Sequence, residues 1–290
     1  MFHPAIILAA ILTLLPYFAA AFFPQITAKP VRLPKPARLL LPALLCIPYA
    51  LVSTSANIFE WRWLALYALL PVIIAILLDR ACRADPNQLG NWRDFLVLAV
   101  IGLAVDLRWF QPAWPARLAA FNKILLLDAG IYGFLYIRQL NGVGFNLRLR
   151  PRDLGIGWRE FLFYAPIAIA FGLALGFLHL HAILPSAPRS LAAFAFSFFF
   201  VAIPEELFFR GWLQNLLERR IGRAPALILT AILFGLSHFN KRAAHFNWRY
   251  VLLAAIAGVF YGRAWRDRRR VGASAITHAT VDTVWGLWLR

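Results

Sequence analysis

Six ionisable side chains lie within three apolar stretches of the C-terminal part of the chain, where charge is otherwise scarce. They are Glu205, Glu206, Arg210, His238, His278 and Asp282. An ionisable group inside a bilayer costs roughly 2.5–3.5 kcal/mol on insertion scales, so such residues point to function. Each motif alone also has a structural interpretation, as an ion pair in a helix bundle or a residue at a helix end. Their occurrence together in three apolar segments favours a functional site, because apolar residues would pack better.

The spacing of these residues allows them to meet. Three pairs are separated by four positions, so the two members of each pair share one face of a helix. The pairs are Glu206 with Arg210, Phe234 with His238, and His278 with Asp282. We therefore expect the three helices to direct these side chains into one polar cavity within the membrane.

Such a set of residues is suited to hydrolysis by an activated water. Two adjacent carboxylates in a low-dielectric interior cannot both ionise easily. Arg210 would offset this repulsion and hold Glu206 ionised, which leaves Glu205 to act as a general base. His238 and His278 would orient the water, donate to an oxyanion or protonate a leaving amine. Peptide-bond hydrolysis fits best, and a divalent metal bound by the Glu and His side chains is the alternative mechanism. The sequence contains neither HExxH nor GxSxG.

The rest of the chain is apolar enough to hold this site in a membrane. Hydrophobic residues make up 61% of the sequence and charged residues 15%, against roughly 25% charged residues in a soluble domain. This composition excludes a disordered chain and disfavours a soluble globular protein. About ten apolar runs approach the length that spans a bilayer. They cover residues 5–23, 39–56, 63–78, 95–107, 118–137, 160–178, 190–217, 224–240, 249–263 and 272–289. We predict an all-α, polytopic membrane helix bundle of about ten transmembrane helices.

The net charge of +17, from 30 Lys and Arg against 13 Asp and Glu, has a topological explanation. With the N-terminus outside, about 20 basic residues fall in inner loops and about 8, including Lys241, fall outside, as the positive-inside rule predicts. The bias favours ten helices with both ends outside. Nucleic-acid binding has no supporting motif. We expect an integral protein of a bacterial cytoplasmic membrane, because the Ala, Leu and Arg usage is typical of a high-GC bacterium.

The polar segment 138–160 divides the chain into two parts. Residues 1–150 hold N-terminal membrane helices of undetermined role, and residues 155–290 hold the candidate site. Residues 1–23 have no Lys or Arg before their apolar run, so we interpret them as a retained helix; Ala19–Ala21 leaves cleavage as the alternative. Within the first part, Lys123 and Asp128 interrupt the fifth predicted helix.

The three C-terminal motifs resemble those of the CPBP family of intramembrane proteases, also called the Abi or CAAX-processing endopeptidases. The family pattern is EExxxR, FxxxH and HxxxN on successive membrane helices. The matching residues are Glu205, Glu206, Arg210, Phe234, His238, His278 and Asp282. The resemblance covers about residues 155–290. It implies a helical core around a cavity, with the first Glu activating water and the His residues assisting. The family has been labelled metalloprotease, but a metal-independent glutamate mechanism fits its motifs better, so we expect no required cofactor.

Asp282 stands where the family more usually has Asn. An ionised carboxylate only accepts hydrogen bonds, so Asp282 cannot donate one to an oxyanion in that state. The resemblance implies a membrane-associated peptide or protein as substrate, such as the prenylated CAAX tails of eukaryotic relatives. Two other classes stay open: a transporter or proton-coupled carrier that uses Glu205, Glu206 and Asp282, and a non-catalytic scaffold. The sequence leaves the oligomeric state open.

Overall fold

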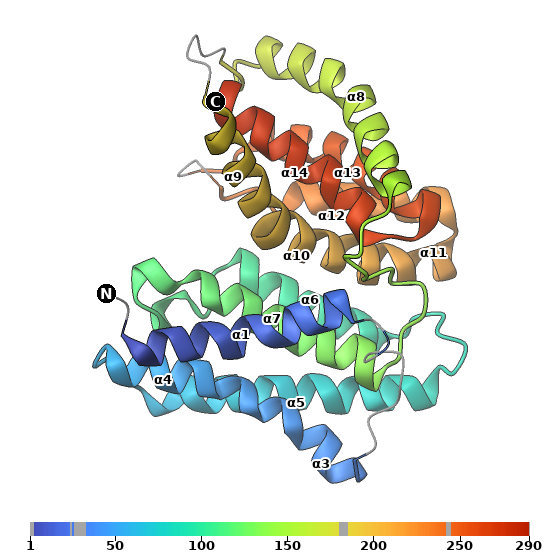
Figure 1. The fold of residues 1–290 in the computed structure, drawn as a ribbon. Helices are drawn as coiled ribbons and strands as arrows, with labels where there is room; N and C mark the ends of the chain where they lie inside the picture. The colour runs from blue at the N-terminus through green and yellow to red at the C-terminus, as the bar shows by residue number, and fades with distance from the viewer. Residues whose placement is uncertain (1–2, 24, 26–32, 180–184, 242–244, 290) are drawn as a thin grey trace. The chain divides into compact units, whose positions relative to one another are not determined.

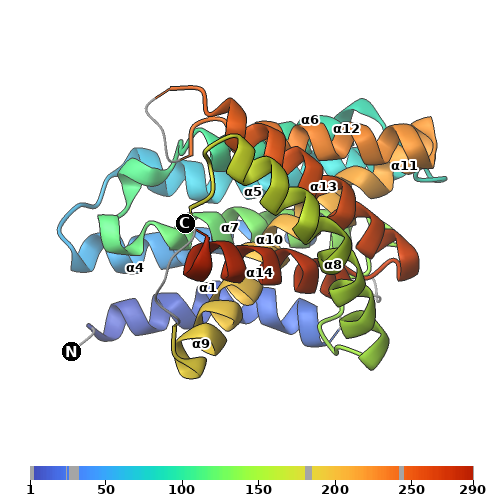
Figure 2. The ribbon, with the colours of Figure 1, turned by 90° about the horizontal axis from the view of Figure 1, so that it is seen from above.

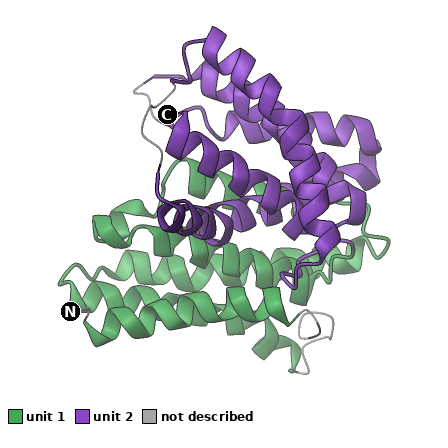
Figure 3. Ribbon diagram, turned by 45° about the horizontal axis from the view of Figure 1, so that its top comes forward, with its two compact units in different colours: residues 1–141 green, residues 142–290 purple. Residues whose placement is uncertain are grey.

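The computed structural model describes residues 3–23, 25, 33–179, 185–241 and 245–289 (Figure 1). These residues form helices and connecting segments without a strand, which confirms the all-α prediction for the described part of the chain. The chain divides into two compact units, Met1–Asn141 and Gly142–Arg290 (Figure 3). Four basic residues that enter the topology prediction lie outside the described residues: Lys29, Arg32, Arg242 and Arg290.

The first unit is a helical bundle in which α1 packs against α4 and α7, and α5 packs against η1, α6 and η4. Its elements are α1 (Pro4–Phe22), α3 (Lys35–Leu40), η1 (Leu41–Cys46), α4 (Ile47–Ser55), α5 (Trp61–Ala84), α6 (Trp92–Asp106), η2 (Gln111–Ala113), η3 (Ala116–Leu118), α7 (Ala120–Ile131) and the π-helical η4 (Tyr132–Ile137).

A buried ion cluster closes one end of this unit. Arg138, which the topology prediction counts as a loop charge, is fully buried. Its Nε donates to Asp94 Oδ1 at 2.9 Å, and its Nη2 donates to Asp85 Oδ2 at 2.7 Å. Burial disfavours the Asp85 carboxylate, but the amides of Leu89 and Gly90, together with Arg138, outweigh it and lower the pKa of Asp85. Arg138 is therefore buried because two carboxylates of this unit neutralise it.

Lys123 and Asp128 differ in their surroundings. Lys123 is exposed, which agrees with its position near a helix end. Asp128 is buried, and neither of its carboxyl oxygens has a hydrogen-bond partner among the described residues.

The second unit holds the candidate site. Its elements are α8 (Pro151–Ala174), α9 (Ala187–Ser197), the π-helical η5 (Phe198–Ala202), α10 (Ile203–Glu206), the π-helical η6 (Leu207–Gln214), α11 (Asn215–Ile221), α12 (Arg223–Leu236), α13 (Trp248–Arg268) and α14 (Val271–Trp288). Helices α8, α13 and α14 pack on one another (Figure 2). Helix α12 packs closely on α13 because Gly235 has no Cβ; a Cβ there would lie 2.5 Å from the Val251 carbonyl oxygen.

The run from α9 to α11 is a continuous helical stretch of 35 residues, Ala187–Ile221. Its regular α-helical hydrogen bonding is interrupted by the two π segments, η5 and η6, on either side of α10. Pro204 lies in α10 and has no N–H, so an unbroken α-helical ladder cannot pass this point. Segments of π-helix within α-helices occur frequently at functional sites.

A helix covers most of each of the ten predicted apolar runs. Six helical stretches in the described part of the chain are long and apolar enough to cross a membrane. They are Pro4–Phe22, Lys35–Ser55, Trp61–Ala84, Ala116–Ile137, Pro151–Ala174 and Ala187–Ile221. Helix α6 has 15 residues, a length of about 22 Å against a hydrocarbon thickness of about 30 Å. The count of ten crossings therefore stays a prediction.

Candidate active site

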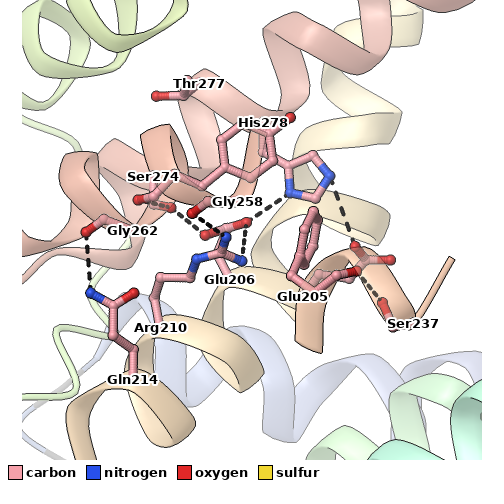
Figure 4. A network of polar contacts seen from close by, with 12 residues as sticks. Glu205, Glu206, Arg210, Gln214, Ser237, Gly258, Gly262, Ser274, Thr277 and His278 are labelled. Carbon is pink, nitrogen blue, oxygen red and sulfur yellow. Dashed lines mark hydrogen bonds and ion pairs between the residues drawn. The ribbon is translucent and has the colours of Figure 1, made fainter. Parts of the chain in front are cut away.

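Glu206 and Arg210 form the buried centre of the site (Figure 4). Both side chains are fully buried, and Arg210 Nη1 donates to Glu206 Oε1 at 3.1 Å. Arg210 Nη2 donates to the carbonyl oxygen of Gly258 on α13 at 2.9 Å. The guanidinium carbon lies 4.6 Å from the ring centroid of Phe234, the first residue of the FxxxH motif. The Arg210 charge is thus held by a carboxylate, a carbonyl and an aromatic face.

Glu206 also binds two residues of α14. Ser274 Oγ donates to Glu206 Oε2, and His278 Nδ1 lies 2.8 Å from Glu206 Oε1. Because an ionised carboxylate only accepts, the proton of this second bond belongs to His278 Nδ1. Ser274 is not among the residues predicted from the sequence. It lies four residues before His278, as His278 lies four before Asp282, so the helical spacing was a signal for it.

Glu205 has a more open environment than its neighbour. Its side chain keeps 26% of its surface exposed, whereas that of Glu206 keeps none. Glu205 Oε2 lies 3.9 Å from His278 Nε2, and Glu205 Oε1 lies 3.6 Å from Lys241 Nζ. The two adjacent glutamates therefore differ: Glu206 is held inside the helix bundle, and Glu205 stands at the accessible edge of the cluster.

The two remaining predicted residues complete the site. Asp282 Oδ2 lies 3.6 Å from His278 Nε2 and accepts a hydrogen bond from Ser197 Oγ at 2.9 Å. His238 is buried, and its Nδ1 lies 2.8 Å from the Phe234 carbonyl oxygen. Since a carbonyl only accepts, this nitrogen carries a proton. Asp282 and both histidines border one common cavity.

This cavity measures about 80 Å³ and is lined mainly by apolar residues of α8, α13 and α14. Tyr164, Ala168 and Trp285 belong to its wall, together with the candidates His238, His278 and Asp282. The ring of Tyr261 stacks on His278, with centroids 4.6 Å apart and planes 15° apart. An apolar chamber beside a cluster of acid–base groups is suited to bind an apolar substrate group next to the reacting bond.

Two of the groups that could bind a divalent metal already have partners within the protein. Arg210, Ser274 and His278 occupy both oxygens of Glu206, and the bond to Glu206 occupies His278 Nδ1. A catalytic zinc ordinarily has three protein ligands. Among the described residues, no group of three or more His, Cys, Asp and Glu side chains is placed to hold a metal ion. The arrangement instead presents one accessible carboxylate facing an imidazole.

One comparison with known proteins finds a match within the C-terminal part of the chain. Residues 187–284 match the family described as type II CAAX prenyl endopeptidase, Rce1-like. This match confirms the resemblance to the CPBP proteases and favours a protease over the transporter and scaffold alternatives. No curated protein and no solved structure matches the chain. The six apolar helices, together with the family, identify an integral membrane protein.

Proposed function

We propose that the chain, whose residues 187–284 belong to the Rce1-like type II CAAX prenyl endopeptidases of the CPBP family, is an intramembrane endopeptidase. It cleaves a peptide bond of a membrane-associated substrate with a water activated by Glu205. We place it in a bacterial cytoplasmic membrane, as the sequence composition suggests.

The observation that carries this proposal is the difference between the adjacent glutamates. Glu206 is occupied by Arg210, Ser274 and His278. Glu205 is partly exposed and faces His278 Nε2 across 3.9 Å. A water molecule can hydrogen-bond to both atoms at this separation, since such bonds measure about 2.7–3.2 Å. The pair therefore supplies a general base and an orienting group for one water.

The mechanism follows from these positions. Glu205 takes a proton from the water as its oxygen attacks the carbonyl carbon of the scissile bond. His278 holds one proton on Nδ1 toward Glu206, and with a second proton on Nε2 it donates a hydrogen bond to the oxyanion that forms. His238 carries its proton on Nδ1, so its Nε2 accepts a hydrogen bond and helps to position the water. When the C–N bond breaks, Glu205 returns its proton to the leaving amine, and the products are a carboxylate and an amine. Arg210 and Ser274 hold Glu206, which fixes the orientation of His278.

The size of the cavity limits what binds beside the bond. An apolar cavity of about 150 Å³ accommodates benzene, and this one measures about 80 Å³. It fits a short aliphatic side chain and is too small for a whole isoprenoid chain. We therefore propose a membrane-associated peptide with an aliphatic residue next to the cleaved bond as substrate.

Filling the cavity with a larger side chain is expected to change which aliphatic residue the enzyme accepts next to the cleaved bond. Ala168 lines the cavity, so Ala168→Leu places a branched side chain in it. The expected result is a decrease of about tenfold or more in kcat/KM for peptides with Leu beside the bond, relative to peptides with Ala, since one or two methylenes in a pocket change discrimination by this amount. Ala170→Leu is the matched control, because Ala170 is exposed and lies about 200° around α8 from Ala168. An equal change in both variants would contradict the assignment of the cavity.

Removal of metal ions is expected to leave the activity unchanged. The proposed base and oxyanion donors are protein side chains, so a strong chelator such as EDTA should not alter the rate of the purified enzyme. Cleavage of one peptide before and after dialysis against the chelator measures this. Loss of activity that returns with added Zn²⁺ would replace the glutamate mechanism by a metal mechanism.

The membrane peptidome provides the test of the function itself. Cells that express the wild-type chain should contain membrane-derived fragments that are missing from cells expressing Glu205→Ala at the same level. Identical peptidomes at equal expression would contradict the proposed protease activity, and the fragments that differ provide reporter peptides for the other experiments.

A further inference from the structure

Lys241 carries one of the few basic charges that the predicted topology places on the outer side of the membrane. Its Nζ lies 3.6 Å from Glu205 Oε1. We propose that Lys241 is a positioning residue that favours the ionised form of the Glu205 base and offsets the negative charge of Asp282. This inference rests on the proposed function, because it assigns Lys241 a role in the reaction of Glu205.

The backbone around Lys241 is held in place on both sides. Its N–H donates to the carbonyl oxygen of His238 at 3.2 Å. Its carbonyl oxygen accepts from Asn247 Nδ2 at 3.1 Å, and Asn247 Oδ1 in turn caps α13 by accepting from the Tyr250 N–H at 3.3 Å. Lys241 is thus tied to the turn that bears His238 and, through Asn247, to the first turn of α13. The long side chain reaches Glu205 from this anchored position, although 30% of it is exposed.

The charges around Glu205 explain why a cation is needed there. The charged groups next to it on its own helical run are Glu206 and Arg210, which pair with each other. Helix α14 contributes His278 and Asp282, and the segment after α12 contributes His238 and Lys241.

The carboxylates of Glu205 and Asp282 both approach one nitrogen of the His278 ring. Glu205 Oε2 and Asp282 Oδ2 lie 3.9 and 3.6 Å from His278 Nε2. Because both carboxylates lie within 4 Å of the same nitrogen, they also lie near each other, and neighbouring like charges disfavour each other's ionised form. The ammonium of Lys241 is the cation of the described site that remains to offset them, because Arg210 is committed to Glu206.

The pH dependence of cleavage tests this role. The full-length protein is purified in dodecyl maltoside, and kcat/KM for one reporter peptide from the peptidome comparison is measured between pH 5 and pH 9. In Lys241→Met, the acidic limb of the profile is expected to move to higher pH, so activity at pH 6 falls about tenfold and recovers towards pH 9. Lys241→Arg keeps the charge and should retain the wild-type limb. In the double variant Lys241→Met with Asp282→Asn, the limb should move back towards lower pH, whatever the maximum rate.

Two comparisons make the outcome decisive. Lys123→Met removes an exposed lysine of the first unit and should leave the profile unchanged. An acidic limb that stays in place in Lys241→Met, or that moves equally in Lys241→Arg, would overturn the inference. Full activity of Glu205→Gln in the same assay would instead overturn the proposed function, so the two failures are distinguishable.

Discussion

Replacement of Glu205 by Gln is expected to lower kcat/KM for a membrane-anchored peptide by about 10²–10⁴-fold, the range that a general base contributes. The amide has almost the shape of the carboxylate but cannot take the proton of the attacking water. The fold should persist, because Glu205 is partly exposed and is not part of the buried cluster around Arg210. The measurement is the initial rate of cleavage in detergent, with product identity established by mass spectrometry.

The melting temperature of Glu205→Gln provides the control for this prediction. It should equal that of the wild-type protein, which separates lost chemistry from lost structure. Cleavage at the wild-type rate would remove Glu205 from the mechanism and would leave His278 and Asp282 as the candidates for the base.

Replacement of the adjacent Glu206 by Ala should have a different consequence: a loss of about 3–5 kcal/mol in the free energy of unfolding, because Arg210 is left as an uncompensated buried charge. Ser274 and His278 also lose their acceptor. The activity should disappear together with the structure of the second unit. Denaturant titration in micelles, followed by tryptophan fluorescence, measures the stability.

A double variant tests the physical reason for this loss. Replacing an entire buried ion pair by apolar residues is often neutral or stabilising. Glu206→Leu with Arg210→Met should therefore be more stable than Glu206→Ala, although inactive. If Glu206→Ala unfolds at the same denaturant concentration as the wild-type protein, the buried pair does not stabilise this unit.

Most residues of the site could be predicted from the sequence, because charged residues are rare in apolar membrane helices and are easily recognised there. Glu206 with Arg210 and His278 with Asp282 stand out from apolar neighbours, and their four-residue spacing predicts a shared face. The structure brings these four residues and Glu205 into one network. Ser274 was missed because a serine is unremarkable in a membrane helix, although it extends the same spacing.

Other features depend on tertiary contacts that no local pattern records. Arg138 follows an apolar run and was interpreted as a loop residue, yet it is fully buried and paired with Asp94. The number of crossings is also poorly defined by local hydrophobicity, since α6 and α12 are apolar but have only 15 and 14 residues. Lys241 appeared as an exception to the charge bias, and its distance to Glu205 becomes visible only in three dimensions.

The π segments on both sides of α10 have a consequence for how this region tolerates changes in length. One residue more or fewer in a helix rotates everything beyond it by about 100°. A one-residue deletion that converted η6 into regular α-helix would rotate the residues after it relative to Glu206, although every motif residue was retained. Deletions within Phe198–Gln214 should therefore be as damaging as the loss of a catalytic side chain. The length and rotation of this helical run therefore determine the geometry of the site as much as the identity of its residues does.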